Sequence, residues 1–147
     1  MKKSIYSQGL YFSCVKCSAC CRHESGIVVL TENDLKLLAD FKKMGYNEFT
    51  EAYCRWVPYW NGAERLSLKE KPGYDCIFWE DGCSVYPVRP LQCRAFPFWE
   101  SIVNSSAAWK SIAASCPGMN KGTLVTRDEI ESWLGKQAAE KIIVRKL

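Results

Sequence analysis

The sequence predicts a small α+β fold, mostly helical, in which a short β-hairpin and cysteine-rich loops connect the helices. Two segments carry apolar residues at helical spacing, and a third has β-prone arms on either side of an Asp-Gly turn. The chain of 147 residues has the length of one ordinary domain, and its hydrophobic content of 48% suffices for a core. We therefore expect residues 1–147 to form a single domain.

The first helical segment follows a short apolar run at 27–30, which has the length and composition of a strand. Thr31 comes next and is a suitable N-cap, because its hydroxyl can accept a hydrogen bond from a first-turn amide. We expect a helix that ends near Gly45. Its apolar face should consist of Leu35, Leu37, Leu38 and Phe41.

A second helix is expected between Asn47, a good N-cap, and Pro58, which cannot continue a helix. Cys54 falls inside this segment between aromatic residues, so we expect it to be a buried small apolar residue and not a ligand. Residues 60–74 hold two glycines and a proline among charged residues, which predicts an irregular or edge-strand connection.

The third segment, between 76 and 86, has β-prone residues around an Asp-Gly pair, which is a strong signal for a tight hairpin. The two arms should bring Cys76 and Cys83 close together. Two prolines are then expected to halt regular structure before Cys93, which would leave that cysteine on a loop.

The C-terminal part contains two further local signals. Cys116-Pro117-Gly118 predicts a turn. Thr126 and Glu129 match a capping box, which predicts a helix that continues at least to Leu134.

Four of the nine cysteines stand within one short run, Cys14-Val-Lys-Cys17-Ser-Ala-Cys20-Cys21. Because nine is an odd number, the cysteines cannot all pair with one another as disulfides. Two-residue gaps let thiolates converge on one metal ion or cluster, whereas the consecutive side chains of Cys20 and Cys21 diverge, which suggests a second or a multinuclear centre. The expected metal ligands are Cys14, Cys17, Cys20, Cys21, Cys76, Cys83, Cys93 and Cys116.

The type of metal follows less directly from the residues, because four-thiolate sites suit both zinc and iron–sulfur clusters. Cys14, Cys17 and Cys20 have the spacing of a bacterial ferredoxin loop, and Cys116-Pro117 resembles the end of that motif. Zinc sites also use paired cysteines at these gaps. We therefore expect an iron–sulfur cluster or zinc, with iron slightly ahead.

Several charged residues stand close to cysteines in the sequence. His23, the only histidine, could complete a site or move protons, although an exposed residue without a ligand role is the simpler interpretation. Arg22, Arg89 and Arg94 carry guanidinium groups that can either balance thiolate charge or form ordinary surface ion pairs.

Other classes of function are disfavoured. The net charge of +4 is modest and the basic residues are scattered, so nucleic acid is not an expected partner. No apolar run approaches the roughly 18 residues that cross a bilayer, and no signal-peptide core is visible, so we expect a cytoplasmic protein without membrane contact. Phosphate-binding loops, dinucleotide fingerprints and zinc-hydrolase motifs are missing, and no catalytic residue can be named.

Three functions are compatible with these residues. The first is an iron–sulfur or iron/zinc centre held by the eight cysteines and used in redox chemistry or in modification of a protein or small-molecule substrate. The second is a non-enzymatic structural zinc module that presents its helices to a protein partner. The third is thiol–disulfide exchange by Cys17 and Cys20, which the crowd of other cysteines disfavours.

The chain resembles the CxxCxxCC family of zinc- or iron-chelating domains, also called YkgJ-like. Cys14 to Arg22 fits the family signature, Val29-Leu30-Thr31 with Asp34 fits the segment after it, and Cys76 to Phe98 fits a later block. Ser18-Ala19 departs from relatives that often have glycine before the double cysteine. A more distant similarity to flagellin lysine N-methylases implies no reaction for this chain. The most specific matches are Gly82-Cys83-Ser84-Val85-Tyr86 and Arg89-Pro90-Leu91-Gln92-Cys93-Arg94-Ala95-Phe96-Pro97-Phe98.

Overall fold

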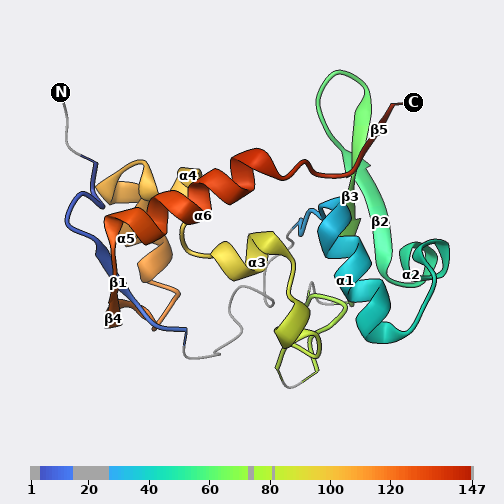
Figure 1. The fold of residues 1–147 in the computed structure, drawn as a ribbon, viewed down its shortest axis with the longest axis horizontal. Coiled ribbons are helices and arrows are strands. Elements are labelled where there is room, and N and C mark those ends of the chain that lie inside the picture. The colour runs from blue at the N-terminus through green and yellow to red at the C-terminus, as the bar shows by residue number, and fades with distance from the viewer. Residues whose placement is uncertain (1–3, 15–26, 73–74, 81, 147) are drawn as a thin grey trace. The chain divides into compact units, whose positions relative to one another are not determined.

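The computed structural model describes residues 4–14, 27–72, 75–80 and 82–146. These residues contain helices and two small antiparallel sheets, so the predicted α+β class is confirmed (Figure 1). The chain divides into two compact units, which are described separately. The first unit consists of Met1–Ala19 and Ala95–Ala139, and the second unit of Cys20–Arg94 and Glu140–Leu147.

The second unit is built around a three-stranded sheet in the order β2-β3-β5. After β3 the chain forms a short 3-10 helix, η2, and then helix α3. The last residue of α3, Ala95, is assigned to the first unit. The elements are α1 (Glu32–Lys42), α2 (Tyr46–Tyr53), β2 (Cys54–Pro58), β3 (Ala63–Leu68), η2 (Tyr86–Val88), α3 (Leu91–Ala95) and β5 (Val144–Lys146).

Helix α1 begins where the sequence predicts. The Thr31 hydroxyl accepts a hydrogen bond from the Asp34 amide at 3.0 Å, and the Asp34 carboxylate accepts one from the Thr31 amide at 3.1 Å. Of the expected apolar face, Leu38 is fully buried but Leu37 and Phe41 are exposed, so the predicted face was wrong at these two positions. The buried face of the helix instead contains Asp34, Leu38 and Ala39.

The predicted second helix was wrong in both of its boundaries. Helix α1 ends at Lys42, and its C-cap Lys43 has the left-handed conformation (φ 57°). Gly45, the expected stop of this helix, is instead the N-cap of α2. Helix α2 ends at Tyr53, and Cys54 is the first residue of a strand. Tertiary pairing with β3 therefore overrides the continuous helical pattern between 47 and 57.

Strands β2 and β3 form a hairpin whose turn is Asn61-Gly62. Both turn residues have positive φ, 57° and 76°, as the tightest hairpin turns require. The Tyr59 amide donates to the Ala63 carbonyl at 2.9 Å across this turn. β3 is the central strand of its sheet, so the prediction of an irregular or edge-strand connection was wrong, and the Asn-Gly pair is the signal that identifies the hairpin.

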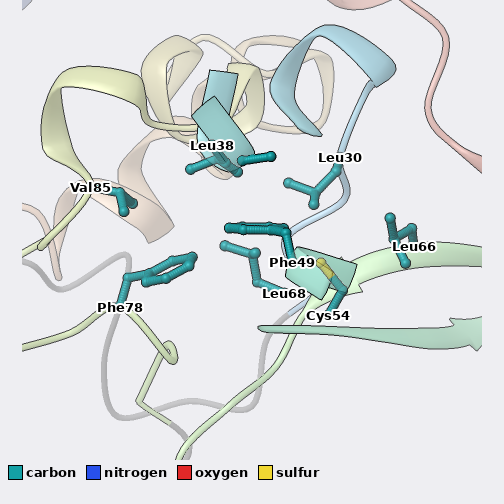
Figure 2. Close-up of a cluster of buried hydrophobic side chains, with 9 residues drawn as sticks. Leu30, Leu38, Phe49, Cys54, Leu66, Leu68, Phe78 and Val85 are labelled. Atoms are coloured by element: carbon teal, nitrogen blue, oxygen red, sulfur yellow. The ribbon is translucent and has the colours of Figure 1, made fainter. Parts of the chain in front are cut away.

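The apolar run at 27–30 is not a strand; it makes one isolated bridge, which pairs Val29 with Ser67. The Leu30 amide donates to the Leu66 carbonyl at 3.1 Å, and the Ile143 amide donates to the Leu30 carbonyl at 2.9 Å. The run thus lies against β3 and the segment that leads into β5. Its fully buried Leu30 joins the core shown in Figure 2, which consists of Leu30, Leu38, Ala39, Phe49, Cys54, Leu66, Leu68, Phe78 and Val85.

Of the hairpin predicted between 76 and 86, the described residues contain one isolated bridge between the arms, which pairs Trp79 with Cys83. The Glu80 amide donates to the Gly82 carbonyl, and the Ser84 amide donates to the Phe78 carbonyl, each at 2.8 Å. In the described residues the arms do not continue as a hairpin, because Cys76 bridges to Glu70 and η2 follows directly afterwards. Asp81 lies outside the described residues.

The first unit contains a two-stranded sheet, which no local signal in the sequence predicted. Its elements are β1 (Leu10–Phe12), α4 (Glu100–Val103), α5 (Ser106–Ala113), β4 (Met119–Val125) and α6 (Arg127–Ala139). β1 and β4 are antiparallel, with Leu10 opposite Val125 and Phe12 opposite Met119. Helix α6 starts after Thr126 as predicted, with the Glu129 amide donating to the Thr126 hydroxyl at 3.2 Å.

Candidate metal centre

Strand pairing in the first unit brings Cys14 and Cys116 to the same end of the β1–β4 sheet. The Ser13 amide donates to the Gly118 carbonyl at 3.1 Å, and the Thr123 amide donates to the Ser13 hydroxyl at 2.9 Å. Cys14 directly follows Ser13, and Cys116 stands two residues before Gly118. The predicted turn is confirmed, since the Met119 amide donates to the Cys116 carbonyl at 3.2 Å. Two cysteines far apart in the sequence therefore lie on backbone segments that meet at one end of this sheet.

The backbone at Gly118 explains how these segments approach so closely. A Cβ atom at this position would lie 2.2 Å from the Ser13 carbonyl oxygen, far inside van der Waals contact. Only glycine leaves room for the approach. Cys116 is buried at this turn, whereas Cys14 is exposed.

In the second unit, Cys76 and Cys83 are half-buried and pack against the same core cluster. Each lies at an isolated bridge, which fixes its backbone: Cys76 pairs with Glu70, and Cys83 pairs with Trp79. Both thiols thus lie beside a cluster of buried apolar side chains, where a bound soft metal would be shielded from water.

Cys93 lies on helix α3, and the prediction of a loop at this position was wrong. The helix starts directly after Pro90, because proline is tolerated at the beginning of a helix, where its missing amide would have no partner. The Pro90 carbonyl accepts hydrogen bonds from the Cys93 amide at 2.9 Å and from the Arg94 amide at 3.0 Å. Cys93 is half-buried.

The two described arginines near the cysteines have partners within the protein. The Arg89 guanidinium lies over the Tyr86 ring, 3.8 Å from its centroid, and its Nε donates to the Tyr86 carbonyl at 3.1 Å. Arg94 Nη2 lies 3.9 Å from Asp34 Oδ1, and Arg94 Nε donates to the Arg89 carbonyl at 3.0 Å. These bonds connect both side chains to the segment that leads into α3.

Cys54 is buried, with 6% of its surface exposed, which confirms the buried position expected for it. Burial in the core raises the pKa of its thiol from the ordinary 9.0 to about 12, although the nearby Lys69 ammonium acts in the opposite direction. Because metals bind the thiolate form, this thiol is poorly suited to be a ligand.

Within the described residues, no group of three or more His, Cys, Asp or Glu side chains is arranged to hold a metal ion. Cys17, Cys20 and Cys21, together with Arg22 and His23, lie outside those residues. The described candidate ligands are nevertheless soft thiols, which fit zinc or iron better than hard cations.

None of the described helices combines the length and the apolar character needed to cross a bilayer.

Comparisons with known proteins identify the type of domain. The family model called CxxCxxCC, described as a "Putative zinc- or iron-chelating domain", matches residues 13–117. A protein of Methanocaldococcus jannaschii, "Uncharacterized protein MJ0661", is 32% identical over 107 residues, which cover 71% of this chain and 54% of that protein. The chain thus spans about half the length of this curated relative. No solved structure matches. Since the family model covers well over half of the sequence, the chain belongs to the CxxCxxCC family of zinc- or iron-chelating domains.

Proposed function

We propose that this protein binds zinc or iron through cysteine thiolates as a single metal-binding domain over residues 1–147. The observation that carries the proposal is the extent of the family match, from 13 to 117. It begins one residue before Cys14 and ends one residue after Cys116, so it encloses every candidate ligand. The proposed ligands are Cys14, Cys17, Cys20, Cys21, Cys76, Cys83, Cys93 and Cys116.

The arrangement of the described cysteines supports this ligand set. Cys14 and Cys116 come from opposite ends of the matched segment, yet the backbone bonds of Ser13 bring them to one end of a sheet. Cys76 and Cys83 both pack against the same core cluster.

We further propose that the metal centre is an iron–sulfur cluster and that it acts in redox or modification chemistry. The two-residue gaps between Cys14, Cys17 and Cys20 support this proposal, because they match a cluster-binding loop. A reducing compartment such as the cytoplasm would keep the thiols available for the cluster.

The alternative is a structural zinc module without enzymatic activity, which binds a protein partner. Its support is the family description, which names zinc beside iron. Closed four-thiolate zinc sites contribute to folding and leave no open position for a substrate.

Metal analysis of protein purified without oxygen tests these proposals. An iron–sulfur centre predicts brown protein with broad visible absorption, iron and acid-labile sulfide, and eight thiolate ligands allow up to two four-thiolate centres per chain. Colourless protein with stoichiometric zinc and no metal-centred redox couple would support the zinc module instead. Protein that retains neither metal, and takes up neither after reduction, would refute metal binding.

Single substitutions then test the ligand set. Cys93→Ser and Cys83→Ser should lower the bound metal per chain or its affinity, because each removes one thiolate. Cys54→Ser is the matched control, since this cysteine is buried in the core and has a raised pKa. Equal metal loss in all three variants would argue that the substitutions act through general destabilisation and not through ligation.

A further inference from the structure

The side chain of Gln92 connects the segment that follows the cysteine run to the helix that carries Cys93. Its Oε1 accepts a hydrogen bond from the Val29 amide at 3.0 Å, and its Nε2 donates to the Ile27 carbonyl at 2.8 Å. The carboxamide therefore pairs with residues 27–29 as a neighbouring strand would. Gln92 directly precedes Cys93 on α3.

Asp34 makes a second connection between the same two segments. Its side chain is 1% exposed, and its Oδ1 accepts a hydrogen bond from the Leu91 amide, the first of α3, at 3.0 Å. Its Oδ2 accepts from the Thr31 amide at 3.1 Å, and Arg94 lies 3.9 Å away as a counter-charge. One buried carboxylate thus serves the N-termini of α1 and α3, where negative charge is stabilised.

We infer that Gln92 and Asp34 are positioning residues for the thiolate of Cys93, because they hold helix α3 against residues 27–34. Ile27 stands six positions after Cys21 in the sequence, and a chain extended over six positions spans about 20 Å at most. By anchoring Ile27 to α3, the Gln92 carboxamide limits how far from Cys93 the chain length allows Cys21 to lie. The inference rests on the proposed function, in which these cysteines bind metal.

The physical reason is preorganisation of the ligands. A metal that must gather thiolates from distant parts of a chain binds more tightly when the protein already holds those parts together. Partners that orient metal ligands without touching the metal typically contribute 10–100-fold to affinity. Neither side chain would contact the metal in this role, since both are engaged with backbone amides and carbonyls.

The test compares two glutamine variants of the full chain. Gln92→Leu keeps the size of the side chain but removes both hydrogen bonds, and we expect it to weaken Zn²⁺ binding about 10–100-fold in competition with a chromophoric chelator. Gln137→Leu is the matched control. Its Nε2 also donates to two backbone carbonyls, of Phe98 at 2.9 Å and Trp133 at 3.0 Å, but it lies on α6, a helix without cysteines.

The expected result is that Gln137→Leu binds Zn²⁺ with the native affinity even if it unfolds at a lower temperature. Native affinity in Gln92→Leu, or an equal loss in both variants, would overturn the inference. A native chain that binds neither Zn²⁺ nor iron would instead refute the proposed function, and the first titration reveals this before any variant is compared.

Amide exchange in the native chain gives a second test that needs no variant. If the Gln92 connection favours metal binding, metal must favour the connection by the same factor, because the coupling is reciprocal. Zn²⁺ should therefore slow exchange of the Val29 amide about 10–100-fold. The Ala108 amide, which donates to the Ser105 hydroxyl at 3.1 Å, should exchange at an unchanged rate. Equal Val29 exchange with and without Zn²⁺ would overturn the inference.

Discussion

At the scale of single residues, Gly118 shows how one missing side chain sets the geometry beside two cysteines. The Ser13 carbonyl occupies the space that a Cβ would need, at 2.2 Å. Any other residue would push β1 away from the turn that contains Cys116. The proline and glycine at 117 and 118 predict the turn, but nothing local in the sequence indicates which segment approaches it.

Gly118→Ala should lower the free energy of unfolding by about 1–3 kcal/mol, since the added methyl group forces the two backbones apart. Urea denaturation measures the change. Gly135→Ala is the control, because a Cβ at this position in α6 meets nothing within 4 Å. This second substitution should raise stability by about 0.5–1 kcal/mol, as alanine favours helix. Native stability in Gly118→Ala would contradict the close approach.

Cys54 predicts a dependence of stability on alkaline pH. In the unfolded chain its thiol loses a proton near the ordinary pKa of 9.0, whereas burial raises the pKa in the folded protein to about 12. Its contribution to stability is therefore complete below pH 9 and is lost as the pH rises from 9 to 12. Over this range the unfolded chain binds up to one proton fewer than the folded protein, so the free energy of unfolding falls with pH. Denaturation at several pH values, compared with Cys54→Ala, isolates this contribution; identical slopes in the two proteins would contradict it.

At the scale of elements, local signals identified the starts of helices α1 and α6 but missed the strands. Thr31 and Thr126 cap helices where predicted, because a cap involves only residues three positions apart. β1 and β4 were not anticipated, and the helical pattern before Pro58 ends in strand β2. Pairing with strands distant in sequence determines the secondary structure of these segments and overrides their local propensity.

The two threonine caps give a matched comparison. Thr31→Ala should lower stability by about 2 kcal/mol, because Thr31 is 5% exposed and the Asp34 amide would lose its acceptor in a buried place. Thr126→Ala should cost about 1 kcal/mol or less, because water can replace the hydroxyl at an exposed cap. Chemical denaturation of both variants measures this difference, and a larger loss in Thr126→Ala would contradict the role of burial.

At the scale of the whole molecule, candidate ligands stand in both compact units, with Cys14 and Cys116 in the first and Cys76, Cys83 and Cys93 in the second. If these cysteines bind metal as proposed, metal binding should stabilise the chain strongly, since the binding energy of the thiolates appears as folding energy. A chelator should lower the thermal midpoint, and added metal should restore it. The same midpoint before and after metal removal would contradict the proposed ligand set.

The cysteine substitutions refine this expectation. The shift caused by the chelator should shrink in Cys93→Ser, because less binding energy is then available to lose. It should stay at the native size in Cys54→Ser, whose thiol belongs to the core. An unchanged shift in Cys93→Ser would remove this residue from the ligands.

The sequence by itself determined the family, the candidate ligands, the α+β class and the helix caps at Thr31 and Thr126, because these depend on residue type and on spacings of a few residues. Only the tertiary structure decided that Cys93 lies on a helix, that Ser13 meets Gly118, and that Gln92 holds residues 27–29. The physical reason is that these hydrogen bonds join groups distant in sequence. They form only when the packing energy of the folded protein offsets the entropy lost on closing the intervening chain.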